Sequence, residues 1–471
     1  MFRKIVPLLI NGVEKKTVES LIFPVLSPFN ENEVLYHAQG ASPSDVLTAL
    51  ETAQSGFVQW KATNYLQRRE VLQNAARLLE SRKPQFLQMM EEMAIPTWFA
   101  NVNIDTSVGM IKEAASLTSQ PQGSIPQTET SDSVSLVFNE PIGPVLSISP
   151  WNAPCILCTR ALVAPIAAGC SVILKSSEHS PLIHYELVKL FVDAGLPPNV
   201  LSLLNSSRET SPAITETLIK SKAVKKVNFT GSTAVGKAVA KIAAENLKPV
   251  LLELGGKGTA IVTRSANLED AAGAIVFGAF AHNGQICMST ERVFVDDAVY
   301  DDFVAILKNV ADSASSSEAL PQRTSTAAAR ASQLVESAVE NGAAFVHGSS
   351  NRNGTYLTPV ILQEVKSEDE IFESETFAPV FFLSRYKDVQ EAIDIANTSA
   401  SGLTSSVWCK DTLEGLSIAR QLESGAVHIN GGTLRDEPVL PHGGVKQSGS
   451  GRFNGIWGIR EFQYLKTVTI S

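Results

Sequence analysis

The sequence has few cysteines and no long apolar run. Its five cysteines are odd in number and widely spaced, at Cys155, Cys158, Cys170, Cys287 and Cys409, which argues against the disulfide framework typical of small secreted domains. No stretch of about 18 consecutive apolar residues occurs, so we predict no membrane span. The N-terminal segment lacks the features of a signal or transit peptide. We therefore expect a cytoplasmic protein.

Clustered basic residues, low-complexity segments and repeats are also missing. With 39 Lys and Arg against 48 Asp and Glu, the formal net charge is -9, and the positive residues are scattered, which argues against a surface that follows nucleic-acid phosphates. We expect a small-molecule partner, with no nucleic acid and no membrane. The 471 residues exceed what one hydrophobic core supports, so two or three domains are predicted.

The hydrophobic pattern indicates a helical N-terminal part followed by an alternation of strands and helices. Apolar residues recur at helical spacing from about 48 to 94, with Pro84 marking a break between two helices. From Val145 short apolar strands alternate with helices, which is typical of a parallel sheet covered on both faces. The polar motifs SPWN, KSSE and TGST each follow a strand. Because ligands bind at the carboxyl ends of such strands, we expect these loops to converge on one crevice.

The segment GSTAVGK, from Gly231 to Lys237, fits the first part of a phosphate-binding P-loop. Ala238 follows where a P-loop needs a Ser or Thr hydroxyl for magnesium, and no convincing strand-end Asp for the metal occurs nearby. We therefore favour a strand-to-helix turn, which is either packed tightly on the sheet or approached closely by a dinucleotide.

Cys287 lies in AHNGQICMSTER, just after a helix predicted from about Leu268 to His282. The carbonyl end of a helix disfavours a nearby thiolate, and free cysteines are commonly buried. Position alone thus predicts an unreactive thiol, so any activation has to come from other residues.

Seven motifs resemble, in order and separation, those of the aldehyde dehydrogenase superfamily over essentially the whole chain: SPWN, KSSE, FTGST, LLELGGK, GQICMSTER, ESETFAPV and HGGVKQSGSGRF. GQICMSTER and LPHGGVKQSGSGRFNG look most like the branch of salicylaldehyde and vanillin dehydrogenases. The resemblance implies an α/β fold with a Rossmann-like parallel-sheet cofactor domain, an α/β catalytic domain and a small β oligomerisation hairpin. The implied division is 1–124, 139–252 and 426–458 for the dinucleotide-binding domain, 253–425 for the catalytic domain, and 125–138 and 459–471 for the oligomerisation strands.

Four catalytic residues follow from this resemblance. Cys287 would attack the aldehyde carbon to form a thiohemiacetal, which gives hydride to nicotinamide and leaves a thioester. Glu253 would activate water for thioester hydrolysis, and burial could raise its pKa toward the range useful to a general base; a strand-end carboxylate tied to backbone amides is the alternative. Asn152 would donate to the oxyanion, unless it only caps the following helix. Lys175 would support the site and the cofactor.

The resemblance also implies NAD as cofactor, with NADP possible. Glu178 would hold the adenosine ribose and repel a 2′-phosphate, which favours NAD, although Ser177 and Glu178 could equally be helix-capping residues. Ala378, where the family commonly has glycine, puts the clamp formed by Glu375 and Phe377 in doubt. The implied cofactor set is Ile148, Ser149, Trp151, Lys175, Ser177, Glu178, Gly231, Ser232, Leu254, Gly255, Glu375 and Phe377, with no metal.

A second departure is His442, where many family members carry Phe. We interpret it as a surface-loop histidine, with the border of the substrate path as the alternative. Cys155 and Cys158 form a C-x-x-C without a partner pair for a metal, and one of them could line the pocket. The candidates for an aryl-sized pocket are Trp98, Met110, Trp151 and Phe453, although such residues are usually core.

The function implied by the resemblance is NAD(P)-dependent oxidation of an aldehyde, aromatic by its branch, to the carboxylic acid. Two alternatives stay open. One is a CoA-acylating dehydrogenase, in which CoA and not water takes the acyl group; Glu253 argues against it, because this residue would activate water. The other is a non-catalytic binding protein of the same fold. SVSLVFNE and FQYLKTVTIS match the family's projecting hairpin and C-terminal strand, which joins a neighbour's sheet. A homodimer or homotetramer is therefore expected.

Overall fold

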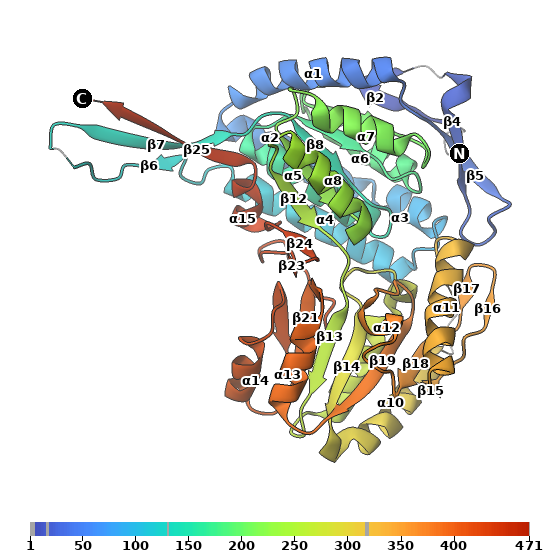
Figure 1. The fold of residues 1–471 in the computed structure, drawn as a ribbon. Coiled ribbons are helices and arrows are strands. Elements are labelled where there is room, and N and C mark those ends of the chain that lie inside the picture. Colours follow the sequence, from blue (N-terminus) through green and yellow to red (C-terminus); the bar gives the residue numbers. More distant parts are fainter. Residues whose placement is uncertain (1–4, 16–17, 130, 316–319, 471) are drawn as a thin grey trace.

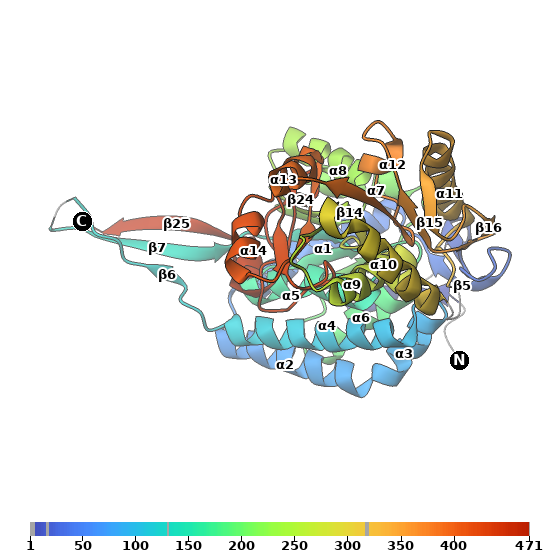
Figure 2. The ribbon, with the colours of Figure 1, turned by 90° about the horizontal axis from the view of Figure 1, so that it is seen from below.

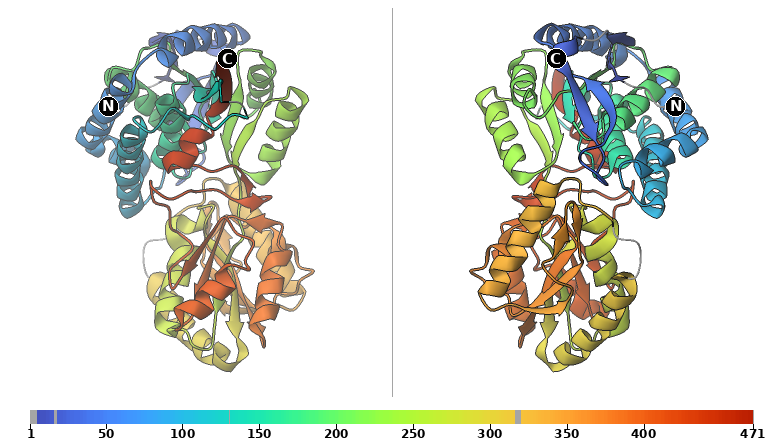
Figure 3. Two further views of the ribbon diagram at one scale, coloured as in Figure 1. Left: turned by 90° about the vertical axis from the view of Figure 1, so that its left-hand side faces the viewer. Right: turned by 90° about the vertical axis from the view of Figure 1, so that its right-hand side faces the viewer.

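Two large sheets organise the protein. The structure is a computed structural model that describes residues 5–15, 18–129, 131–315 and 320–470. Figure 1 shows one unit above the other, with a narrow arm projecting from the upper unit, and both views of Figure 3 show the same stacking. No helix within the described ranges has the length and apolar character needed to cross a membrane.

The first sheet has a parallel centre and antiparallel edges. Its parallel strands are joined by pairing of β12 with β11, β11 with β8, β8 with β9 and β9 with β10. In spatial order the sheet consists of β24 (Gly449–Ser450), β12 (Val250–Glu253), β11 (Lys226–Thr230), β8 (Val145–Ile148), β9 (Val172–Lys175), β10 (Leu201–Leu204), β2 (Leu8–Ile10) and β3 (Val13–Lys15).

Alternate residues of these strands enter different cores. Val145 of β8 packs into one apolar cluster, whereas Leu146 and Ile148 pack into another, because successive side chains point to opposite faces. Both faces are covered, which explains the continuous apolar runs. The first cluster involves α2 (Tyr65–Ser81), α3 (Lys83–Glu91), α4 (Thr97–Leu117), α5 (Pro154–Ala168) and α6 (Pro181–Asp193), and the second involves α1 (Pro43–Lys61), α7 (Ser211–Lys220) and α8 (Thr233–Glu245).

Helix α5 is buried along its whole length. Apart from Thr159 and Arg160 its sequence is apolar, which is typical of a helix enclosed within the core. The predicted break at Pro84 is confirmed, because α2 ends at Ser81 and α3 begins at Lys83 with the proline in its first turn.

The second sheet repeats this design. Ile261 packs on one face, and Ala260 and Val262 pack on the other. The strands, in spatial order, are β15 (Ala344–His347), β18 (Val360–Gln363), β19 (Val380–Tyr386), β14 (Thr290–Asp296), β13 (Gly258–Val262), β21 (Thr404–Trp408) and β22 (Ala426–Ile429). The helices are α9 (Leu268–Phe280), α10 (Tyr300–Ser315), α11 (Ser325–Glu340), α12 (Glu370–Glu373), α13 (Val389–Thr398) and α14 (Thr412–Ala419).

One implied boundary between the two units is displaced. Strand β22 pairs in parallel with β21, so residues 426–429 belong to the second sheet and not to the dinucleotide-binding unit, where the sequence analysis placed them. The chain then crosses back and supplies β24 to the first sheet.

Short elements complete the chain. They are β1 (Ile5–Val6), β4 (Ile22–Leu26), β5 (Val34–Gln39), β16 (Arg352–Asn353), β17 (Tyr356–Leu357), β20 (Ser401–Gly402), β23 (Val445–Lys446), α15 (Gly455–Arg460), and the 3-10 turns η1 (Glu19–Leu21), η2 (Ala281–Gly284) and η3 (Asp297–Val299).

The projecting arm is a three-stranded sheet. Its strands are β25 (Gln463–Ile470), β7 (Val134–Pro141) and β6 (Gly123–Ser124), with β7 in the middle. The full length of β25 pairs antiparallel with β7 of the same chain. Figures 1 and 2 agree that the arm stands clear of the body, with the C-terminus near its tip.

Candidate active site

The carboxyl ends of four neighbouring strands meet at one edge of the first sheet. Ile148 at the end of β8 is in register with Lys175 at the end of β9, and Thr230 at the end of β11 is in register with Glu253 at the end of β12. The loops that follow therefore lie side by side. The predicted convergence of SPWN, KSSE and TGST is confirmed, and LGGK joins them.

Two buried polar side chains at these strand ends have capacity for a ligand. The Ser149 hydroxyl is buried and has no hydrogen-bond partner within the described part of the chain. Lys175 is 4% exposed, and its Nζ donates to the Ser176 carbonyl at the long distance of 3.4 Å. Burial lowers the pKa of Lys175, and the nearby Glu178 opposes that shift. Both side chains suit a bound polar group.

Ser177 and Glu178 do not cap helix α6. The N-cap of α6 is Ser180, which makes no side-chain capping bond, and the Ser177 hydroxyl instead accepts from the His179 N–H at 3.2 Å. The Glu178 side chain is 31% exposed, with Oε1 3.9 Å from His179 Nε2. The capping alternative is therefore wrong, and Glu178 is partly accessible beside the end of β9.

The glycine loop is a tight strand-to-helix turn. The Gly231 N–H donates to the Glu253 carbonyl at 3.1 Å, and a Cβ here would lie 2.7 Å from the Phe229 ring. Ser232 caps α8 by accepting from a backbone N–H of the first turn. Lys237 donates from Nζ to Gln447 Oε1 at 2.8 Å. The lysine of the P-loop pattern is thus engaged elsewhere, while the helix N-terminus stays open to an anionic group.

An unusual turn precedes Cys287. Helix α9 ends at Phe280, after which His282, Asn283 and Gly284 have φ values of 48°, 56° and 71°. Gln285 braces the turn, because its side chain donates to the His282 carbonyl at 3.2 Å. Non-glycine residues in this conformation cost on the order of 1 kcal/mol or more each and persist where the surroundings enforce them.

Asn152 joins the first sheet to the Cys287 segment. Its Nδ2 donates to the Gln285 carbonyl at 3.1 Å, and the N-cap of the following helix α5 is Ala153, without a side-chain cap. The capping alternative for Asn152 is therefore wrong. Asn152 and Cys287 both line one cavity.

This cavity, of about 250 Å³, is mainly apolar. The rings of Trp98 and Phe277 lie 5.3 Å apart and are 43% and 53% exposed, so they form the outer part of the wall. The other lining residues are Phe99, Val102, Thr106, Asn152, Ala153, Ile156, Leu157, Arg160, Ile286, Cys287, Met288, Leu434, Asp436 and His442.

Three of the four aromatic and methionine candidates do not line this cavity. Trp98 does, whereas Met110, Trp151 and Phe453 lie elsewhere, and Met110 is 3% exposed within the core. Likewise, the wall contains neither Cys155 nor Cys158, whose thiols face inward from α5 and whose pKa values are raised by burial.

The first turn of α5 reaches the cavity. Ala153, Ile156 and Leu157 belong to its N-terminal end and line the wall. The positive end of a helix dipole favours negative charge. Because this end and Cys287 line the same cavity, it favours an anion that forms there.

Glu253 is fully buried at the end of β12. Both carboxylate oxygens lack a hydrogen-bond partner among the described residues, so the alternative of a carboxylate tied to backbone amides is wrong. Burial acts to raise the pKa of Glu253, but His442 and the Arg160 charge outweigh it and hold the pKa below its ordinary value. The net shift is thus opposite to the one expected from burial alone.

Cys287 is half-buried in the cavity wall. Burial and the neighbouring Glu253 carboxylate raise the pKa of its thiol well above the ordinary value. At neutral pH the resting pair is therefore a protonated thiol beside an ionised carboxylate, which is the protonation state in which Glu253 can act as a base.

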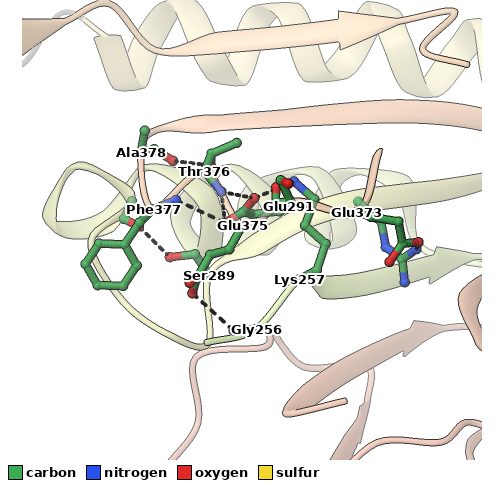
Figure 4. A network of polar contacts seen from close by, with 12 residues as sticks. Gly256, Lys257, Ser289, Glu291, Glu373, Glu375, Thr376, Phe377 and Ala378 are labelled. Carbon is green, nitrogen blue, oxygen red and sulfur yellow. Dashed lines mark hydrogen bonds and ion pairs between the residues drawn. The ribbon is translucent and has the colours of Figure 1, made fainter. Parts of the chain in front are cut away.

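Glu375 approaches the glycines that follow Glu253. Its Oε1 accepts from the Gly256 N–H at 3.1 Å (Figure 4), and a Cβ on Gly255 would lie 2.4 Å from its Oε2. Burial and the Glu291 carboxylate raise the pKa of Glu375 to about 8. Leu254 is buried and packs against Gly236 of α8.

A buried ion pair that the sequence analysis missed supports this loop. Lys257 Nζ lies 2.6 Å from Glu291 Oε2, and both side chains are almost fully buried. Glu291 also accepts from the backbone N–H groups of Thr376 at 2.9 Å and Phe377 at 3.4 Å, as Figure 4 shows. The sequence signal for this pair was the charged residue in each of two motifs, Lys257 in LGGK and Glu291 in STER.

Alanine at 378 does not disturb the turn. The left-handed residue is Phe377, with φ of 50°, and Ala378 is absent from the positive-φ residues of the described chain. A Cβ is therefore tolerated at 378. Phe377 lies across from Trp151, with ring centroids 6.2 Å apart, so the ESETF loop meets the SPWN loop of the first unit.

His442 is 6% exposed and lines the cavity. The surface-loop interpretation is therefore wrong, and the alternative at the substrate path is the observed one. Its Nε2 lies 3.9 Å from Glu253 Oε1, and its Nδ1 lies 3.8 Å from Asp436 Oδ1.

Comparisons with known proteins agree with this arrangement. Residues 13–468 match the aldehyde dehydrogenase family. Salicylaldehyde dehydrogenase of Pseudomonas sp. (strain C18) is 38% identical over 470 residues, which are 98% of this chain and 96% of that one. Vanillin dehydrogenase of Pseudomonas fluorescens is 38% identical over 473 residues, covering 99% and 98% of the two chains.

The fold is likewise shared with solved enzymes. The crystal structure of a salicylaldehyde dehydrogenase from Pseudomonas putida G7, complexed with salicylaldehyde, has a TM-score of 0.96 and 37% identity, covering 100% of this chain and 98% of that one. Among the solved relatives, one was crystallised with NAD⁺ and another is named an NADP dependent enzyme, which supports a nicotinamide cofactor here. The chain belongs to the aldehyde dehydrogenase family and is an aldehyde-oxidising enzyme.

Proposed function

We propose that this enzyme oxidises an aromatic aldehyde to its carboxylic acid through a thioester on Cys287. The observation that carries the proposal is the common cavity, which joins Cys287 and Asn152 to an apolar wall containing Trp98, Phe99 and Phe277. A flat apolar ring suits such a wall. The salicylaldehyde and vanillin dehydrogenases to which the chain is similar are named for aryl aldehydes.

Each side chain of the site has a separate role in the reaction. Cys287 Sγ attacks the carbonyl carbon, and Glu253 is placed to take the thiol proton because it is ionised and adjacent. The Asn152 amide and the N-terminal end of α5 favour the negative oxygen of the tetrahedral intermediate. The nicotinamide cofactor, when bound, accepts the hydride. Oxidation of the aldehyde releases one proton, so the thiol proton leaves Glu253 before this carboxylate takes a proton from the water that attacks the thioester.

The cofactor would be held along the strand ends of the first sheet. Lys175 and Ser149 provide the buried polar groups described above, and Glu178 provides an accessible carboxylate. Gly231 and Ser232 begin the α8 end that can accept a pyrophosphate. The remaining groups that we assign to the cofactor are Ile148, Trp151, Ser177, Leu254, Gly255, Glu375 and Phe377.

A substrate panel tests this function. Purified enzyme is given benzaldehyde, salicylaldehyde, vanillin and aliphatic aldehydes with NAD or NADP, and NADH or NADPH formation is followed by absorbance. We expect the aryl aldehydes and NAD to give the highest kcat/KM. Product analysis with and without CoA should yield the free acid in both cases. Acyl-CoA as the product, or a preference for aliphatic aldehydes, would contradict the proposal.

Cofactor affinity should depend on pH through Glu375. Its pKa of about 8 means that the carboxyl is mostly protonated at pH 7, whereas the ionised form is the better acceptor for ribose hydroxyls. The dissociation constant for NAD should therefore fall about tenfold between pH 7 and pH 9. Titration of tryptophan fluorescence measures it, and Glu375→Gln should remove the dependence. A wild-type dissociation constant that is flat over this range would exclude the assignment.

We further propose that the arm mediates assembly into a homodimer or homotetramer. Directly paired residues of antiparallel strands point to the same face, and β25 pairs Val468 with Leu136 and Ile470 with Val134. Val134, Val468 and Ile470 are 49%, 38% and 55% exposed. An exposed apolar face on an edge strand is an aggregation hazard unless another chain covers it.

Charge on this face should dissociate the assembly. Val468→Asp places a carboxylate at its centre, and we expect sedimentation at micromolar concentration to shift from an oligomer to a monomer. Thr467→Asp is the matched control, because Thr467 lies on the opposite face in register with Val137, and it should leave the sedimentation coefficient unchanged. A monomeric wild type would refute the proposed role of the arm.

A further inference from the structure

Glu253 is a base without access to solvent. Its side chain is 0% exposed, and neither carboxylate oxygen has a hydrogen-bond partner in the described chain. Only an ionised carboxylate can take a proton from water, so the proton that Glu253 takes from the Cys287 thiol has to leave through a neighbouring group before thioester hydrolysis. The two ionisable groups next to the carboxylate are Cys287 and His442.

The Nε2 atom of His442 faces the Glu253 carboxylate. This nitrogen is buried, has no hydrogen-bond partner within the described residues, and lies 3.9 Å from Glu253 Oε1. Closing this distance by about 1 Å gives an ordinary hydrogen bond, and such contacts in enzymes often tighten only when substrate is bound. The family commonly carries Phe at this position, which has no proton to give or accept.

Two hydrogen bonds hold the backbone of His442, and the opposite edge of its ring faces a carboxylate. The His442 N–H donates to the Phe453 carbonyl at 3.1 Å, and the Phe453 N–H donates back at 2.7 Å. On its other side, Nδ1 faces Asp436 Oδ1 at 3.8 Å. A carboxylate at Nδ1 favours the tautomer with the proton on Nδ1 and leaves Nε2 as an acceptor.

Asp436 is itself anchored. It forms an ion pair with Arg160 of α5 and accepts from Asn454 Nδ2 at 2.8 Å. Burial opposes ionisation, but Arg160 and His442 hold the pKa of Asp436 below its ordinary value. The charged groups around His442 are thus the carboxylates of Asp436 and Glu253 and the guanidinium of Arg160, with the Cys287 thiol beyond Glu253.

We propose that His442 is a positioning and proton-relay residue that receives, at Nε2, the proton that Glu253 takes from the Cys287 thiol, which restores the carboxylate before thioester hydrolysis. This inference rests on the proposed thioester mechanism and adds to it a residue that the family pattern does not supply. The site then consists of a chain of side chains from Arg160 through Asp436, His442 and Glu253 to Cys287.

The proposed proton transfers occur in a fixed order. After the thiol proton has moved to Glu253 and the thioester has formed, Glu253 passes that proton to His442 Nε2, which forms an imidazolium between two carboxylates. The water oxygen then attacks the thioester carbonyl carbon while one water proton moves to Glu253, and the C–S bond breaks to release the acid and the Cys287 thiolate. Glu253 gives this second proton to the thiolate, which restores the Cys287 thiol. The imidazolium loses its proton through the cavity that His442 lines, and this is the one proton that the overall oxidation releases.

Rapid-quench kinetics with benzaldehyde and NAD separate the two half-reactions. The NADH burst reports thioester formation, and the later appearance of benzoate reports hydrolysis. We expect His442→Phe to keep the burst within about twofold and to slow hydrolysis by about 10-fold to 100-fold, less than removal of the base itself. His442→Gln, which can donate a hydrogen bond but cannot carry a proton, should be equally slow, and both variants should lose one ionisation from the pH profile of hydrolysis.

Several results would overturn the relay. They are unchanged hydrolysis in both variants, full recovery in His442→Gln, or loss of the burst together with hydrolysis, which would show that the ring only shapes the site. His428→Phe, which removes a half-buried imidazole from β22, is the control and should behave as wild type. A wild-type enzyme that forms no NADH from benzaldehyde and NAD would instead overturn the proposed function.

Discussion

Cys287→Ser should abolish aldehyde oxidation while leaving the fold and the cofactor site intact. A serine hydroxyl beside Glu253 is far less acidic than a thiol and forms an ester, which is a poorer acyl donor than a thioester. We expect NADH formation to fall by about 10⁴-fold or more, as is typical when a catalytic nucleophile is removed. The measurement is NADH absorbance with benzaldehyde, together with NAD binding by fluorescence, which should be unchanged.

The matched control is Cys409→Ser. Cys409 is a buried thiol in the second unit, and its Sγ lies 3.2 Å from the Asp411 carbonyl. This change tests the general effect of replacing a buried thiol by a hydroxyl, and the activity should stay near that of wild type. If Cys287→Ser retained more than about one per cent of the rate, another group would have to be the nucleophile.

Local patterns predicted the elements that depend on local physics. The alternation of apolar strands with helices after Val145 predicted the parallel sheet and the convergence of its loops, because side-chain burial on both faces follows directly from the strand period. Pro84 predicted the helix break, since proline fixes the backbone of the chain at that point. The family resemblance then placed Cys287, Glu253 and Asn152 in one site.

Local patterns could not predict features that depend on contacts between distant parts of the chain. Ala426–Ile429 is a short apolar strand that could pair with either sheet, and its pairing with β21 assigned it to the second. His442 lies in a glycine-rich loop, which predicts exposure, but its pairing with Phe453 and its position between two carboxylates bury it. Membership of a sheet and burial of a loop residue are set by distant parts of the chain.

The pKa of Glu253 illustrates the same limit. Burial at a strand end was visible from the sequence and predicts a raised pKa. The opposing groups, Arg160 and His442, are more than 90 and more than 180 positions away in the chain, and only folding brings them to the carboxylate. Their effect reverses the sign.

Glu253→Gln should arrest the enzyme after one turnover and also make Cys287 more reactive. The amide cannot take a proton from water, so thioester hydrolysis should slow by about 10²–10⁴-fold, and rapid mixing with benzaldehyde and NAD should give a burst of one NADH per active site. Because the Glu253 carboxylate raises the pKa of the Cys287 thiol, its neutralisation lowers that pKa and increases the thiolate fraction at pH 7. Alkylation by iodoacetamide should therefore be faster than in wild type, with its pH midpoint moved downward.

The two measurements on Glu253→Gln distinguish two roles of one carboxylate. Slower alkylation would mean that Glu253 serves Cys287 mainly as its base, because loss of proton acceptance would then outweigh loss of charge repulsion. Glu375→Gln is the comparison variant. The Glu375 carboxylate also raises the pKa of Cys287, but its effect is smaller than that of Glu253. The variant should lower the thiol pKa less and leave thioester hydrolysis unimpaired. Equal shifts in both variants would assign the raised pKa to general negative charge in the site and not to the direct neighbour of the sulfur.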